Sequence, residues 1–112
     1  MKKIEAIIRL ARFEKVRDAL GHIGIRFFTM HEVNGFGLQR GEKITYRGSV
    51  YDSDYIARLQ LDIYADDDRV DEIVNTIIEA AKTGDVGDGK IAIFDVSHVV
   101  RIRTGETGAN AI

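Results

Sequence analysis

The chain repeats one order of hydrophobic periods, strand then helix then strand, in each of its two halves. In the first half, Lys3 to Leu10 alternates apolar and polar residues, and apolar residues then recur at helical spacing from Phe13 to Ile23. Ile25 to Val33 is rich in β-branched and aromatic residues and predicts a second strand. Alternation predicts that the buried face of the first strand carries Ile4, Ala6, Ile8 and Leu10.

The second half shows the same order more clearly. Leu59, Leu61 and Ile63 alternate with polar residues and predict a third strand. Three aspartates at 66–68 are expected to cap and charge the start of a helix. Ile91 to Ile102 predicts a long last strand. The apolar stripe of the predicted helix consists of Val70, Ile73, Val74, Ile77, Ile78 and Ala81.

Two strand–helix–strand halves predict a ferredoxin-like α+β domain of order βαββαβ, in which two helices cover one face of an antiparallel sheet. The 112 residues fit a single domain with one core. The face without helices needs cover, which oligomerisation would supply. The apolar candidates for that second face are Ile7, Phe28, Tyr64, Ile91 and Ile93.

The two halves are joined by a long segment, Asn34 to Tyr55, that contains four glycines and shows no sustained period. We expect a structureless loop of roughly 20 residues there. Loops of that length are uncommon in a small domain and are usually functional.

Composition excludes several classes of protein. The net charge of −2 is against a general nucleic-acid binder, and the absence of cysteine excludes disulfides and cysteine–metal sites. His22, His31 and His98 share no metal-ligand spacing and are interpreted as structural or surface residues. There is no apolar run of about 18 residues and no signal-peptide core, so we expect a cytoplasmic protein.

The clearest chemical feature is the glycine-rich run Thr83 to Lys90, followed by Arg101 and Arg103. Three glycines in six positions let the backbone approach a ligand closely, and Lys90 adds a cation. If the following segment is a strand, the two guanidinium groups point to one side. This combination suits a polyphosphate. It is not a Walker A loop, because Ile91 follows Lys90. The alternative is a helix C-cap glycine entering a turn, with ordinary surface cations on the next strand.

Several motifs agree in order and in spacing with those of one known family, over the whole chain from Met1 to Ile112. They are Glu32-Val33-Asn34-Gly35-Phe36-Gly37 with Gln39, Tyr46-Arg47-Gly48-Ser49 with Tyr51, Thr83 to Lys90, Phe94-Asp95-Val96, and Arg101-Ile102-Arg103-Thr104-Gly105-Glu106. On these motifs the chain resembles the PII nitrogen-regulatory signal-transduction proteins. The resemblance implies a single PII-type domain over residues 1–112, a homotrimer of ferredoxin-like subunits, and ATP or ADP bound competitively in clefts between neighbours. It implies a regulator and not an enzyme, without catalytic residues.

The resemblance also implies three functional segments: a T-loop at about 36–55 that touches target proteins, a B-loop at 83–90, and a C-terminal loop at 102–112. Gln39 would bind Mg²⁺, held through ATP, and 2-oxoglutarate, with Arg9 and Arg58 as further ligands of that second site. The implied nucleotide-binding residues are Ile7, Thr29, Gly35, Phe36, Gly37, Tyr64, Gly87, Asp88, Gly89, Lys90, Arg101 and Arg103.

The targets that the resemblance implies are an ammonium transporter or an enzyme of nitrogen metabolism. Membrane contact would then occur only through the transporter, and no nucleic acid would bind. Tyr51 occupies the position that is uridylylated in some members, and Arg47 the position that some members insert into an ammonium channel. The alternative for both residues is an ordinary exposed loop side chain.

The chain departs from the family pattern at five positions, among them Leu10 where proline is usual and Ala92 where an aromatic residue is typical. Leu38 stands where arginine is usual, Arg58 where lysine is usual, and Val50 where an acidic residue usually precedes the tyrosine. Two alternatives therefore stay open. One is a diverged PII-like regulator with an altered effector response, which Leu38 and Val50 favour and Gln39 opposes. The other is a slow ATPase or transfer enzyme, for which only Asp62 or Asp88 offers a base.

Overall fold

The structure, a computed structural model, describes residues 1–38, 44–46, 49–51 and 53–112. Three 3₁₀ turns, Leu10–Arg12, Asp67–Arg69 and Gly108–Ala111, accompany the regular elements. The helices and strands are β1 (Lys2–Arg9), α1 (Phe13–His22), β2 (Thr29–Leu38), β3 (Ile44–Tyr46), β4 (Ser49–Tyr51), β5 (Ser53–Ala65), α2 (Val70–Ala81) and β6 (Gly89–Asp95). In these described ranges, no helix has the length and apolarity needed to cross a membrane.

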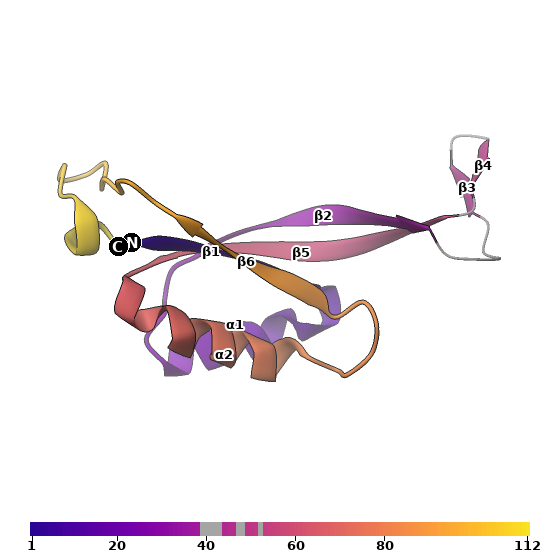
Figure 1. Ribbon diagram of the computed structural model, residues 1–112, viewed down its shortest axis with the longest axis horizontal. Coiled ribbons are helices and arrows are strands. Elements are labelled where there is room, and N and C mark those ends of the chain that lie inside the picture. The colour runs from indigo at the N-terminus through magenta and orange to yellow at the C-terminus, as the bar shows by residue number, and fades with distance from the viewer. Residues whose placement is uncertain (39–43, 47–48, 52) are drawn as a thin grey trace.

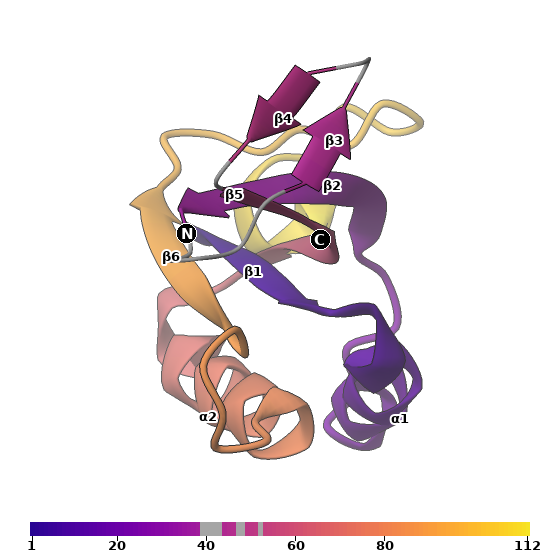
Figure 2. The ribbon, with the colours of Figure 1, turned by 90° about the vertical axis from the view of Figure 1, so that its right-hand side faces the viewer.

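Four strands form one sheet in the order β2-β5-β1-β6, and every pairing in it is antiparallel. Both α-helices lie on the same face of this sheet, and no α-helix of the described residues lies on the other face (Figures 1 and 2). The predicted ferredoxin-like α+β fold is therefore confirmed. β2 and β6 are the two edge strands of the sheet.

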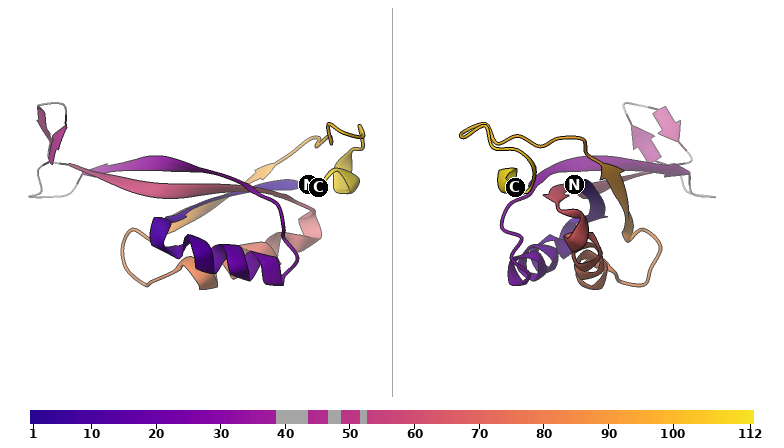
Figure 3. Two further views of the ribbon diagram at one scale, coloured as in Figure 1. Left: turned by 180° about the vertical axis from the view of Figure 1, so that it is seen from behind. Right: turned by 60° about the vertical axis from the view of Figure 1, so that its left-hand side comes forward.

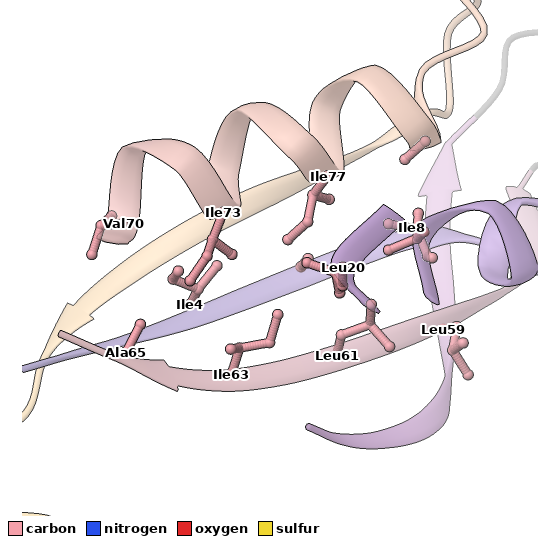
Figure 4. Close-up of a cluster of buried hydrophobic side chains, with 13 residues drawn as sticks. Ile4, Ile8, Leu20, Leu59, Leu61, Ile63, Ala65, Val70, Ile73 and Ile77 are labelled. Carbon is pink, nitrogen blue, oxygen red and sulfur yellow. The ribbon is translucent and has the colours of Figure 1, made fainter. Parts of the chain in front are cut away.

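The core lies between the helices and the sheet, where the two hydrophobic periods meet (Figure 4). The period of two in β1 and β5 turns every second side chain toward the helices, and the period of 3.6 in α1 and α2 returns an apolar stripe to the sheet. The buried residues are Ile4, Ala6, Ile8, Val16, Leu20, Leu59, Leu61, Ile63, Ala65, Val70, Ile73, Ile77 and Ala81.

Two residues predicted to be buried are not. Leu10 is 41% exposed, because β1 ends at Arg9 and a 3₁₀ turn then breaks the alternation. Ile78 is also 41% exposed, since it lies at the margin of the α2 stripe.

The aspartates at 66–68 do not cap the helix by side-chain hydrogen bonds, contrary to the prediction from the sequence. Neither the 3₁₀ turn Asp67–Arg69 nor α2 has a side-chain hydrogen bond at its N-cap. Asp67 instead pairs with the N-terminal amine of Met1 at 2.5 Å.

The second predicted strand begins later and ends later than expected. Residues 25–28 connect α1 to the sheet: the Ile25 N–H donates to the Leu20 carbonyl at 2.9 Å, and the Phe28 ring meets Phe13 edge-on at 6.3 Å between centroids. β2 then pairs with β5 from Thr29 opposite Asp62 to Leu38 opposite Ser53.

This pairing corrects the expectation of a structureless segment between the two halves. β2 and β5 continue past the core as a long hairpin that projects from the body, with the short pair β3 and β4 at its far end (Figure 1). Among the described residues no helix covers the projecting part, so the helices do not require an apolar face there. The sequence therefore loses its alternation while the backbone remains extended.

The last strand is shorter than predicted. β6 ends at Asp95, which lies opposite Lys2, the first residue of β1, so the chain beyond has no partner strand on that side. It turns instead: the Arg101 N–H donates to the Glu106 carbonyl, and the Gly105 N–H donates to the Arg101 carbonyl, both at 2.8 Å. Arg101 and Arg103 therefore do not share a strand face.

Part of the predicted second apolar face is also wrong. Ile91 and Ile93 lie opposite Ala6 and Ile4, whose side chains are buried under the helices, so both belong to the helix side of the sheet. Phe28 packs against the core as well. Ile7 and Tyr64 do lie on the face without helices, since their strand neighbours on either side are core residues.

Candidate functional site

The glycine-rich loop between α2 and β6 packs directly against β1. A Cβ on Gly89 would lie 1.8 Å from the Ile7 carbonyl oxygen, and the φ angle of Gly89 is +105°, so only glycine fits there. A Cβ on Gly87 would lie 3.0 Å from Nη2 of Arg58 and 3.3 Å from Nη2 of Arg9. The backbone of the loop thus passes beside two guanidinium groups.

The side chain of Asp88 holds the conformation of this loop through hydrogen bonds to other loop residues. Its carboxylate accepts hydrogen bonds from the Thr83 N–H at 2.8 Å, the Thr83 hydroxyl at 2.5 Å, the Gly84 N–H at 2.9 Å and Nε of Arg9 at 3.0 Å. The Thr83 hydroxyl, followed by the Thr83 N–H, holds the pKa of the Asp88 carboxyl well below its usual range. The carboxylate is therefore directed into the loop.

Four charged side chains meet at this end of the sheet. Arg9 and Arg58 are cross-strand partners in β1 and β5, and Lys90 of β6 lies opposite Ile7. Alternation places Ile7, Arg9, Arg58 and Lys90 on the face without helices. With Asp88 included, the group combines three cations with one anion. The loop, Lys90 and the two arginines are thus brought together, as a site for an anion requires.

A second group of predicted residues lies at the other end of the sheet. Thr29, Tyr64 and Arg101 line a cleft of about 680 Å³ between the segment after α1, the end of β5 and the C-terminal segment. Arg101 is held there by Glu106, with 3.5 Å between Nη1 and Oε1. Arg103 is exposed in the turn that follows.

The two groups are separated within the single chain. Lys90 lies opposite Ile7, whereas Tyr64 lies opposite Lys3, four residues earlier along β1. That offset is about 13 Å at the usual rise of a strand. The C-terminal segment and the 83–88 loop lie at opposite ends of the body (Figure 3). A single chain therefore does not bring Lys90 together with Arg101 and Arg103.

Other predicted site residues lie along the hairpin or beyond the described part of the chain. Gly35 lies opposite Ile56, and Phe36 is an exposed residue of β2. Gly37 and Tyr51 are described by their backbone, in β2 and β4. Gln39 and Arg47 lie outside the described residues.

Sequence reasoning missed two contributors. Thr83 supplies two of the hydrogen bonds to Asp88, and a threonine five residues before an aspartate in a glycine-rich turn was the available signal. Phe27 is 81% exposed and lines the cleft with Tyr64 and Thr29. No periodicity marks Phe27, because it lies in a connection. In the described ranges no three His, Asp or Glu side chains cluster as a metal site.

The fold and the loop define a ferredoxin-like domain with a glycine-rich loop beside three cations, Arg9, Arg58 and Lys90, at one end of its open sheet face. The family model described as nitrogen regulatory protein P-II matches residues 1–106, and the chain belongs to this family. The predicted resemblance is thereby confirmed. The family consists of signalling regulators of nitrogen metabolism that bind small-molecule effectors, and not of enzymes.

Curated relatives match over their full length. The chain is 49% identical to nitrogen regulatory protein P-II 1 of Escherichia coli (strain K12) and 46% identical to nitrogen regulatory protein P-II of Pasteurella multocida (strain Pm70). Both matches span 112 residues and 100% of each chain. A crystal structure of Arabidopsis thaliana PII bound to citrate is similar, with a TM-score of 0.82 and 40% identity over 99% of this chain and 91% of that one.

Proposed function

We propose that this chain is a PII-type regulator that senses adenylate state. It assembles as a homotrimer and binds ATP or ADP competitively in clefts between neighbouring subunits. With Mg-ATP in place, 2-oxoglutarate binds beside the γ-phosphate through Gln39 and Arg58. The nucleotide is bound and not hydrolysed, and the T-loop at about 36–55 transmits the nucleotide state to a target protein.

One observation carries this proposal: the two halves of the predicted nucleotide site lie at opposite ends of a single subunit. The 83–90 loop and Lys90 lie at one end, and Thr29, Tyr64 and Arg101 lie at the other. A neighbouring copy that places its C-terminal end against the loop end would complete the site. The same assembly would cover the sheet face without helices, which carries Ile7 and Tyr64.

The chemistry of the two halves suits a nucleotide. ATP carries about four negative charges, and Lys90 with Arg101 and Arg103 of a neighbour would offset most of them. Each charge-assisted bond contributes roughly 1.5–3 kcal/mol. A 2-oxoglutarate dianion beside the triphosphate needs a metal between them, and a glutamine carbonyl ligates Mg²⁺ without adding charge.

Titration calorimetry tests the proposal directly, with ATP, then ADP, then 2-oxoglutarate added to the Mg-ATP complex. We expect heat from both nucleotides, and a solution mass of three times the 12.5 kDa chain. An absence of heat with either nucleotide contradicts the proposal. Nucleotide binding without any response to 2-oxoglutarate would identify the diverged regulator that Leu38 suggests. Turnover of ATP within minutes would identify the slow ATPase.

The projecting hairpin suits contact with a target. The molecule measures 51 Å along its longest axis and 27 and 21 Å along the others, and the hairpin accounts for the elongation (Figure 1). We propose an ammonium transporter or a nitrogen-metabolism enzyme as the target, reached from the cytoplasm, with Arg47 as a contact and Tyr51 as a modification site. Surface-immobilised transporter should capture the protein in one nucleotide state and release it in the other.

A further inference from the structure

We propose that the side chains of Arg9 and Asp88 brace the 83–90 loop against β1 before any ligand arrives, and that neither side chain is itself a ligand group. This revises the binding roles that the resemblance implied for both side chains and does not concern the backbone N–H groups of the loop. Membership of the PII family does not by itself give Arg9 or Asp88 this bracing role. The brace itself is a property of the subunit. Its effect on affinity rests on the proposed nucleotide function.

The Asp88 carboxylate has no acceptor position left for a ligand. An ionised carboxylate offers about four acceptor positions. Four donors occupy them: two from Thr83, one from Gly84 and one from Arg9. A carboxylate is also an acceptor only, so it would repel a phosphate instead of holding it. The hydrogen bonds from Thr83 and Gly84 close the loop from its first two positions to its sixth, Asp88.

Arg9 holds the loop on both sides of Gly87. Its Nε donates to Asp88 at 3.0 Å, and its Nη2 donates to the Val86 carbonyl at 2.9 Å. The planar fork of a guanidinium group can reach both acceptors at once, which a lysine ammonium cannot do in fixed geometry. Arg9 and Asp88 are both partly buried, with side-chain exposures of 28% and 23%. The pair therefore fastens the loop to the strand.

Because of this brace, the three cations Arg9, Arg58 and Lys90 have different roles. The charge of Arg9 is matched by Asp88, so Arg58 and Lys90 remain to face an anion at this end of the described chain. Arg58 donates to the carbonyl of its neighbour Ala57 at 3.0 Å and to no loop atom in the described part. A loop already in place saves the ordering cost that a ligand would otherwise meet.

The first test measures amide hydrogen exchange in the ligand-free, full-length protein at the N–H groups of Thr83 and Gly84. Asp88→Asn and Arg9→Gln should each speed exchange there by about tenfold, since a charge-assisted bond is lost. Arg58→Gln is the matched control and should leave these amides unchanged. Unchanged exchange in both Arg9→Gln and Asp88→Asn would overturn the brace.

A milder pair of variants keeps the proposal testable if a charge change prevents folding. Thr83→Val removes the hydroxyl at nearly constant volume, and Thr83→Ser restores it. We expect faster loop exchange and about fivefold weaker ATP binding in the valine variant, and recovery of both in the serine variant. Equal behaviour of the two variants would contradict the proposal.

The second test separates positioning from ligand contact. If Arg9 and Asp88 act as one brace, the double variant should bind ATP no more weakly than the weaker single variant, because both substitutions remove the same interaction. Additive losses, with the loop amides unchanged, would show that Arg9 is a ligand. If the wild-type protein binds no nucleotide, the proposed function fails, while the exchange measurements still decide whether the brace exists.

Discussion

At the scale of single residues, the glycines of the 83–90 loop matter for where they let the backbone lie. Gly89 allows β6 to start directly against the carbonyl of Ile7, and Gly87 passes beside the guanidinium groups of Arg9 and Arg58. The sequence alone predicted close approach of this loop to a ligand. The structure shows that the nearest groups approached are those of the protein itself.

Gly89→Ala should destabilise the protein by about 2 kcal/mol or more, because the added Cβ would overlap the Ile7 carbonyl at a strained φ angle. Urea unfolding followed by circular dichroism measures the change. Gly21→Ala is the control: it lies on the exposed side of α1 with no atom within 4 Å of the new Cβ, and should stabilise by about 0.5–1 kcal/mol. Equal effects of the two substitutions would refute the packing described here.

Lys90→Ala should weaken ATP binding by about tenfold or more, since a charged bond to phosphate is lost. Lys82→Ala, at the other end of the same loop, removes an exposed lysine that pairs with Glu79 and should leave the affinity unchanged. Calorimetric titration of both variants checks this. An unchanged affinity in Lys90→Ala would show that the phosphates bind elsewhere.

Asp88 should stay ionised at a pH at which an aspartate of ordinary pKa takes up a proton. Its folded-state pKa is depressed, so its contribution to stability is fully present above the unfolded value and is lost as the pH falls through the lower folded value. At pH 3.8, the ordinary value, the carboxyl ¹³C shift of Asp88 should still be that of a carboxylate. Thr83→Val should raise the pH midpoint of the Asp88 titration, because the largest stabilising hydrogen bond to the carboxylate is lost. A wild-type midpoint at 3.8 would argue against the internal bonds.

At the scale of elements, burial decided what could be predicted. β1, β5 and both helices carried clear periods because each contributes one face to a common core. Beyond the core no helix of the described residues faces the hairpin, so β2 and β5 extend through residues whose pattern suggested a loop. At the other end, the β-branched residues after Asp95 suggested more strand, but β1 supplies no partner beyond Lys2.

The predicted apolar stripe of α2 contains one buried and one exposed isoleucine, and their contributions to stability can be compared directly. Ile73 is fully buried and Ile78 is 41% exposed, although the sequence period placed both on one face. Ile73→Ala should cost about 2–5 kcal/mol through lost burial and the remaining cavity, and Ile78→Ala about 1 kcal/mol or less. Chemical denaturation distinguishes them. Similar losses at both positions would mean that α2 is rotated relative to the packing seen here.

At the scale of the whole molecule, the site is split. The sequence named most of its candidate residues, since loop chemistry and motif spacing are local features. It could not show that Lys90 and Arg101 lie at opposite ends of the sheet, because their separation depends on the register of β6 against β1 and on the turn after Asp95. The assembled cleft that we propose would be a property of neighbouring copies.

The most direct test of a site built from two subunits is complementation in mixed oligomers. Lys90→Ala and Arg101→Ala should each bind ATP weakly when pure. After the two variants are unfolded together in equal amounts and refolded, about a quarter of the clefts should combine an intact loop with an intact arginine. Calorimetry should then find that fraction of sites at wild-type affinity. No recovery in the mixed oligomers would contradict a cleft shared between subunits.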